Sequence, residues 1–141
     1  MKRYKKLRPN LYSADLHYGK IDIRPDHYCS CFFIVQSTDD MEFIRDQGMQ
    51  LLLAGCRHFD FSGDRRTIWQ KGIEAAHGLV IAGNGGGKAI CMNVWDTIEE
   101  FAVSLNKSIS LRTIIPCDHF LLYDDIGGYK TVLDAIGVID R

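Results

Sequence analysis

Two cysteine–histidine pairs form the clearest metal-binding pattern in the 141-residue chain. Cys56 and His58 make the first C-x-H pair, and Cys117 and His119 make the second. Residues two apart on an extended segment point to one side, so each pair could present its thiolate and imidazole together. Two such pairs would supply the four ligands of a tetrahedral zinc site. The alternative is that both cysteines are buried apolar residues and both histidines hydrogen-bond locally.

The spacing of these pairs matches no known zinc motif, because the sequence has no C-x-x-C or H-x₃₋₅-H knuckle. If a metal ion were bound, Asp60 or Asp118 beside the pairs would support a small metal-dependent hydrolase or phosphoryl-processing enzyme. Asp124 and Asp125 follow the second pair and form a polar cluster with Asp118 and His119. The segment "DDIGG" that contains them is also an ordinary turn composition.

The densest polar segment is "CRHFDFSGDRR", residues 56–66. We expect this segment where a strand ends and a helix begins, which is where α/β proteins bind ligands and helix N-termini present free N–H groups. Its polar side chains would form a pocket for a phosphate or carboxylate: Arg57, His58, Asp60, Ser62, Asp64 and Arg65. The alternative is that Ser62 and Asp64 only cap the helix, with Arg65 on its solvent-facing side.

The glycine-rich stretch "LVIAGNGGGKAICMNVW", residues 79–95, invites comparison with a phosphate-binding loop. A P-loop needs a glycine where Ala82 stands and a hydroxyl residue where Ala89 stands. We therefore interpret the stretch as a β-hairpin whose arms are residues 79–82 and 89–94, with asparagine and glycines at the turn. If the loop instead closed over a ligand, Lys88 would be its charged contact.

The composition, 46% hydrophobic and 25% charged residues, is that of an average soluble globular domain. The longest apolar runs fall far short of the ~20 residues that span a bilayer. No apolar segment follows the basic start as it would in a signal peptide. We therefore expect a cytoplasmic protein with no membrane partner, whose five cysteines are reduced thiols or metal ligands.

The net charge is −1, yet five of the 17 basic residues lie within residues 1–8. We interpret these residues as a solvated, partly disordered arm. The rest of the chain indicates no basic face, so nucleic acid is not an expected partner. The expected partners are a small anionic ligand, an acidic protein surface or further copies of the chain in a homo-oligomer.

Strands and helices alternate along the chain. We predict extended segments at 11–16 and 20–24, strands at 29–36 and 49–55, and a helix between these strands that ends at Gly48. Helices are predicted at 62–77, with Gly78 after the end, and at 96–107. Strands at 109–115 and 120–123 and a short helix ended by Gly137 complete the pattern. Together they predict a single α/β or α+β domain at 1–141, with a mixed sheet covered by three or four helices.

The same order of elements occurs twice. Residues 29–77 and 88–137 each contain a strand, a helix with a Glu-Phe pair, an apolar strand, a C-x-H-F tetrapeptide and a second helix. A duplicated βαββα-type unit would pack about a pseudo-two-fold axis, whereas chance similarity is the alternative.

Polar residues cluster at the ends of elements without forming a complete catalytic motif. The leading hypothesis is therefore a cytoplasmic small-ligand-binding or protein-interaction module, either a sensor or an inhibitor of a partner protein. The alternative is the metal-dependent hydrolase that uses the two C-x-H pairs, with zinc as its cofactor.

Overall fold

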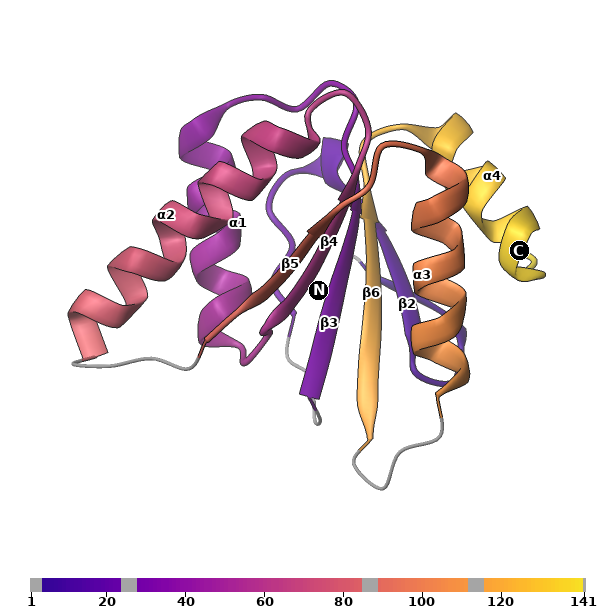
Figure 1. Ribbon diagram of the computed structural model, residues 1–141, viewed down its shortest axis with the longest axis horizontal. Helices are drawn as coiled ribbons and strands as arrows, with labels where there is room; N and C mark the ends of the chain where they lie inside the picture. The colour runs from indigo at the N-terminus through magenta and orange to yellow at the C-terminus, as the bar shows by residue number, and fades with distance from the viewer. Residues whose placement is uncertain (1–3, 24–27, 85–88, 112–115, 141) are drawn as a thin grey trace.

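The chain folds around one mixed six-stranded sheet (Figure 1). A computed structural model describes residues 4–23, 28–84, 89–111 and 116–140. The strand order is β1-β2-β6-β3-β4-β5. β2 (Leu11–Asp15), β6 (Cys117–Tyr123), β3 (Tyr28–Ile34), β4 (His58–Ser62) and β5 (Cys91–Val94) run parallel, and β1 (Lys5–Arg8) pairs antiparallel with β2. The predicted single α/β domain with a mixed sheet is confirmed.

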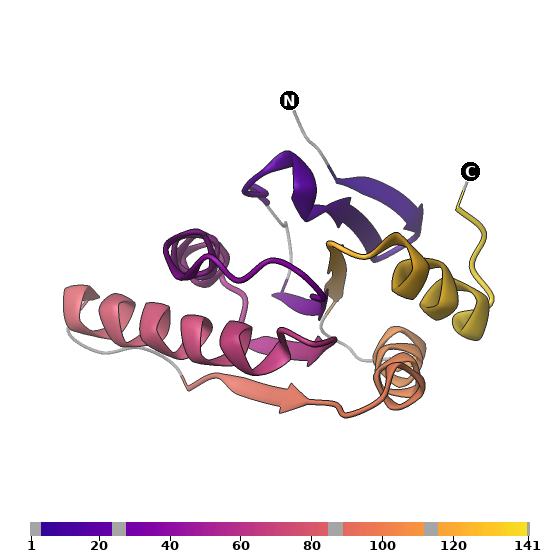
Figure 2. The same ribbon diagram turned by 90° about the horizontal axis from the view of Figure 1, so that it is seen from above.

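Four helices cover the two faces of the sheet (Figure 2). α1 (Met41–Leu53) and α2 (Arg66–Asn84) pack on one face, and α3 (Ile98–Ser110) and α4 (Ile126–Ile136) pack on the other. β3 lies between them and is apolar on both sides, as expected of a central parallel strand. Cys31 and Phe33 point toward α1 and α2, whereas Phe32 and Ile34 point toward α3 and α4.

α1 continues well beyond its predicted end. It begins after Asp40, whose carboxylate accepts hydrogen bonds from the backbone N–H groups of Glu42 and Phe43. The predicted stop at Gly48 and the predicted strand at 49–55 are wrong, because the helix continues to Leu53 and residues 54–55 form the turn after it. A Cβ atom on Gly48 would lie 2.9 Å from the Ile73 side chain, so this glycine allows α1 and α2 to approach closely.

α2 is also longer than predicted, and the hairpin interpretation is wrong. Residues 79–82 belong to this helix, and β5 pairs with β4 in a parallel arrangement. The buried residues Ile73, Ala76 and Val80 follow helical spacing through Gly78, so burial of this side outweighs the roughly 1 kcal/mol cost of an interior glycine. Lys88 lies outside the described residues.

The N-terminal segment is structured where it is described. Lys5–Arg8, within the arm that we predicted to be solvated and partly disordered, forms the partly exposed strand β1. Residues 20–23, which we predicted to be extended, form no strand. The buried Gln47 side chain replaces a strand partner there, since it accepts from Ile21 N at 2.7 Å and donates to Ile21 O at 2.9 Å.

The predicted internal duplication is not confirmed. Both halves have the order strand, helix, strand, helix. However, β3 and β4 are neighbours in the sheet, whereas β5 and β6 are separated by β4 and β3. The two halves therefore connect their strands differently, and a shared pseudo-two-fold arrangement does not follow. In the described ranges, no helix has the length and apolarity needed to cross a membrane.

Candidate functional site

A crevice lies at the carboxyl ends of the parallel strands, next to the point where the chain connections diverge. β3 leads to α1 on one face of the sheet, and its neighbour β6 leads to α4 on the other. In open α/β sheets, ligands bind outside the strand ends at such a point. The crevice measures about 270 Å³, and its polar lining comes from four connections: Gln36, Ser62, Asp64, Arg66, Asp96 and Asp125.

Asp124, the first residue after β6, ties this strand to the β3–α1 connection. Its carboxylate accepts hydrogen bonds from the backbone N–H groups of Gln36 at 2.6 Å, Thr38 at 2.7 Å and Ser37 at 3.1 Å. Burial alone would raise the pKa of Asp124, but these hydrogen bonds hold the pKa below its usual value. The carboxylate is therefore ionised at neutral pH and fixes one side of the crevice.

The Gln36 side chain fixes the opposite wall. Its Nε2 donates to Asp64 Oδ2 at 2.8 Å, and its Oε1 accepts from the Asp64 backbone N–H at 3.0 Å. Gly63, in the connection between β4 and α2, has a φ of 104°. A Cβ atom there would lie 2.2 Å from the Val35 carbonyl oxygen in the β3–α1 connection. Only glycine fits this close approach, so the β3–α1 and β4–α2 connections form one rigid wall.

Carboxylates outnumber cations in the crevice. Asp64, Asp96 and Asp125 line it together with one positively charged side chain, Arg66. Arg66 donates to the Gly63 carbonyl at 3.0 Å and lies 3.4 Å from Asp96 Oδ1. The crevice therefore suits a ligand with a positive charge or hydrogen-bond donors better than an anion.

Helix N-termini also face this end of the sheet, where all four helices begin (Figure 1). Their partial positive charge would favour an anion if their N–H groups were free. At α4, Asp125 Oδ2 accepts from the Gly128 N–H at 3.1 Å, and at α3, Thr97 Oγ1 accepts from the Glu100 N–H at 3.1 Å. The chain's own caps thus occupy these two groups.

The predicted ligand-binding segment, residues 56–66, does not form a single pocket. Ser62 and Asp64 line the crevice, and Arg65 follows them, with its Nε 3.8 Å from Asp39. Arg57 and His58 lie at the other end of β4, about 13 Å away at roughly 3.3 Å per residue. The segment spans the length of the sheet because the preceding apolar segment is helix and β4 begins at His58, so the structure separates Arg57 and His58 from Ser62 and Asp64.

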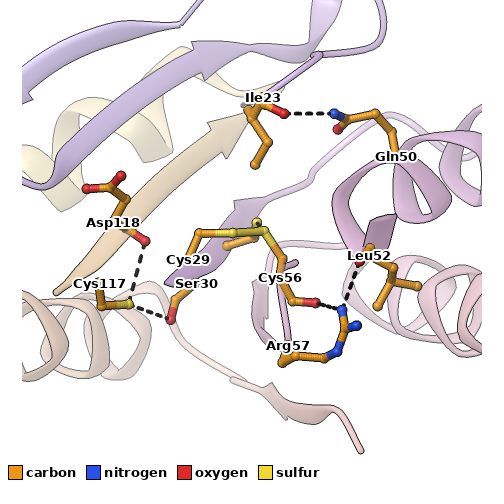
Figure 3. Close-up of a disulfide and its surroundings, with 10 residues drawn as sticks. Ile23, Cys29, Ser30, Gln50, Leu52, Cys56, Arg57, Cys117 and Asp118 are labelled. Carbon is orange, nitrogen blue, oxygen red and sulfur yellow. Dashed lines mark hydrogen bonds between the residues drawn. A yellow bond between two sulfur atoms is a disulfide. The ribbon is translucent and has the colours of Figure 1, made fainter. Parts of the chain in front are cut away.

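Arg57 and Asp60 have structural partners instead of an open pocket. Arg57 Nη1 donates to the carbonyl oxygens of Leu52 at 2.9 Å and Cys56 at 2.8 Å, which caps the C-terminus of α1 (Figure 3). Asp60 is buried in the middle of β4. Its carboxylate accepts from Trp95 Nε1 at 2.8 Å and Ser104 Oγ at 2.7 Å, so it ties β4 to the segment after β5 and to α3.

The proposed zinc tetrad is not assembled. Cys56 forms a disulfide with Cys29, so its sulfur is not a free thiolate (Figure 3). The expectation that all five cysteines are reduced thiols or metal ligands is wrong for this pair. His58, Cys117 and His119 do line one recess of about 820 Å³ at the amino ends of the strands. Among the described residues, however, no three acidic, histidine or cysteine side chains are grouped so that they could hold a metal ion.

Burial shifts the pKa of two groups in this recess, Cys117 and His119. Burial raises the pKa of the Cys117 thiol, which lies 3.6 Å from the Ser30 hydroxyl, so the thiol is protonated at neutral pH (Figure 3). Burial lowers the pKa of His119, whose Nδ1 lies 3.2 Å from the Asn10 carbonyl oxygen. Burial therefore favours the neutral forms of Cys117 and His119.

Four polar side chains that line the crevice were not predicted as ligand contacts: Gln36, Arg66, Asp96 and Asp125. Each lies in the connection after a different parallel strand, or at the start of the following helix. The available signal was a polar residue just after each apolar strand.

Comparison with protein-family models, curated proteins and solved structures finds no match to this chain.

Proposed function

We propose that this protein is a small-ligand-binding module and that its ligand occupies the crevice at the carboxyl ends of β3, β4 and β6. The observation that carries this proposal is the position of the crevice at the divergence of the chain connections. The Gln36–Asp64 and Gln36–Asp124 hydrogen bonds hold its walls in place without a ligand. Such preorganisation reduces the ordering cost of binding.

The lining favours a ligand that carries a positively charged amine. Its donors would face the carboxylates of Asp64, Asp96 and Asp125, while Arg66 is already engaged by Gly63 and Asp96. The anionic ligand expected from the sequence is less compatible with this balance of charge. The volume lies just below the roughly 300–1,000 Å³ of pockets for drug-sized ligands, so the ligand is a small metabolite.

The metal-dependent hydrolase has weaker support. Three residues assigned to it lie at the amino ends of the strands: His58, Cys117 and His119. The crevice lies at the opposite ends of the same strands. A histidine at that end cannot act as general base on a ligand in the crevice, because proton transfer needs hydrogen-bond distance.

Binding to a panel of probes with different charge tests the proposal. Isothermal titration calorimetry of the wild-type protein would compare agmatine, glucose and inorganic phosphate as cationic, neutral and anionic probes. We expect heat of binding with agmatine and a weaker signal with glucose. Binding of phosphate in preference to agmatine would contradict the charge assignment, and no binding by any probe would count against the ligand class.

A further inference from the structure

The solvent-facing side of α3 carries a row of residues whose order is self-complementary. Trp95, Glu99, Val103, Lys107 and Leu111 follow one another at intervals of four, running from just before α3 to just after it. Glu99, Val103 and Lys107 are neighbours on the helix surface because residues four apart lie on one side of a helix, while Trp95 and Leu111 flank the helix. All five line one groove of about 500 Å³, which we call the α3 groove.

Trp95 packs partly against the core, whereas the α3 residues of the row lie apart from the side of the helix that packs on the sheet. Phe101, Ala102 and Leu105 face the core and are buried. Val103 and Leu111, by contrast, are 55% and 70% exposed. Apolar side chains that line a groove and remain this exposed indicate an interaction surface.

The aromatic end of the row is held rigidly. The Trp95 indole N–H donates to the buried Asp60 carboxylate at 2.8 Å, and the Trp95 backbone N–H donates to Phe61 O at 3.0 Å. A tryptophan fixed in this way can contribute apolar area to a contact with little loss of conformational entropy.

The five side chains of the row are, in order, apolar, acidic, apolar, basic and apolar. When this row faces a reversed copy of itself, apolar residues face apolar residues and the acidic residue faces the basic one. If a second α3 lies antiparallel across the first, with a two-fold axis at Val103, the two Val103 side chains meet. Glu99 then faces Lys107 of the second copy, and Trp95 faces its Leu111. A parallel arrangement would instead place Glu99 against Glu99 and Lys107 against Lys107, which is repulsive.

We propose that the α3 groove is the interface of a homodimer in which the two α3 helices pack antiparallel about Val103. Each contact occurs twice, as a two-fold interface requires. The occupant is a second copy of this chain because the charges of the row complement that same row. This inference is independent of the ligand proposed for the crevice.

The position of α3 permits such a contact. α3 and β5 lie on the side of the molecule away from β1 (Figure 2). The exposed residues of β5, Cys91 and Asn93, add no charge to this side. The opposite edge strand, β1, carries Lys5, Lys6 and Arg8. Charged side chains on an edge strand discourage association. The side formed by α3 and β5 is therefore better suited to contact with a second copy than the β1 edge.

The dimer should dissociate on dilution. One pair of 13-residue helices offers a small contact compared with the roughly 1,200–2,000 Å² buried in standard stable interfaces. Sedimentation velocity from micromolar to millimolar protein should therefore show a monomer–dimer equilibrium. A wild-type protein that stays monomeric throughout would overturn the proposal and leave the α3 groove to a different partner.

Substitutions in the row test its geometry. Val103→Glu places two carboxylates together at the axis and should weaken association by about tenfold or more. Ile139→Glu, at a residue that is 72% exposed outside the row, is the matched control and should associate like wild type. A dimer that Val103→Glu leaves intact would overturn the proposal.

Charge reversal tests the antiparallel register. Lys107→Glu should weaken association, because the new carboxylate faces Glu99 of the second copy. Adding Glu99→Lys to this variant should restore association, with circular dichroism confirming that each variant is folded. If Lys107→Glu dissociates the dimer and adding Glu99→Lys does not recover it, the antiparallel pairing is wrong.

Discussion

The Asp124 carboxylate accepts a 2.6 Å hydrogen bond from the backbone N–H of Gln36 and thereby joins the connections after β6 and β3. These two strands are neighbours in the sheet, although their connections lead to helices on opposite faces. The Asp124 carboxylate also accepts hydrogen bonds from the backbone N–H groups of Ser37 and Thr38, so it holds the two connections together where they separate. The proposed ligand crevice depends on this link, since Gln36 also forms its wall.

The first prediction is that Asp124 gives the protein an acid-sensitive stability. The folded-state pKa is lowered, so the ionised carboxylate stabilises the fold at neutral pH. This contribution is lost as the pH falls below about 4 toward the folded-state pKa. Asp124→Asn should cost about 1–3 kcal/mol at neutral pH, because an amide cannot accept the same set of N–H donors. The cost should shrink as the pH falls.

Urea unfolding at several pH values measures this effect. Asp134→Asn, at an exposed residue of α4, is the control and should leave the free energy of unfolding close to that of wild type at every pH. A difference between Asp124→Asn and wild type that is the same at acidic and neutral pH would show that the charge of the carboxylate contributes nothing.

The second prediction is that Arg57→Ala destabilises the fold. The guanidinium donates to the Leu52 carbonyl in the last turn of α1 and to the Cys56 carbonyl after the helix. Its removal would deprive the Cys56 carbonyl of this donor, while the Leu52 carbonyl still accepts from the Gly55 N–H at 3.1 Å. We expect a loss of about 1–2 kcal/mol in the free energy of unfolding. Arg45→Ala, at an exposed residue of the same helix, should have little effect. An Arg57→Ala protein with wild-type stability but impaired ligand binding would favour the original pocket assignment instead.

The third prediction concerns the Cys29–Cys56 disulfide. The two residues are 27 positions apart, and closing a loop of this length stabilises a fold by about 3.5 kcal/mol in the chain-entropy treatment. Reduction with dithiothreitol should lower the free energy of unfolding by an amount of this order. The reductant should have no such effect on the Cys29→Ala/Cys56→Ala variant. Equal sensitivity of that variant would mean that another thiol is responsible.

Sequence patterns predicted the class of the fold because the central strands are strongly marked. The apolar run at Cys29–Gln36 has few alternatives to a buried strand, and the structure places β3 there. Helix lengths were harder to predict, since Gly48 and Gly78 look alike in the sequence. Gly48 allows two helices to pack closely, whereas a Cβ atom on Gly78 would meet no neighbour within 4 Å. Only tertiary contacts distinguish such glycines from helix ends.

Sequence patterns placed only two residues of the proposed crevice, for a related reason. Ser62 and Asp64 were identified because they follow a strand and precede a helix. Asp125 joins them because β6, the last strand in the chain, inserts between β2 and β3. Local patterns do not contain this strand order, so the sequence could not bring the four connections together.

The central claim is that the crevice carboxylates bind an amine-bearing ligand. The Asp64→Asn/Asp96→Asn variant removes two negative charges, and an asparagine at position 64 can still accept the hydrogen bond from Gln36. Asp46→Asn/Asp134→Asn makes the same change in net charge at exposed residues of α1 and α4, outside the crevice. Calorimetric titration with agmatine should show affinity about tenfold or more weaker for the crevice variant, and wild-type affinity for the control. Equal affinity in both variants would contradict the account.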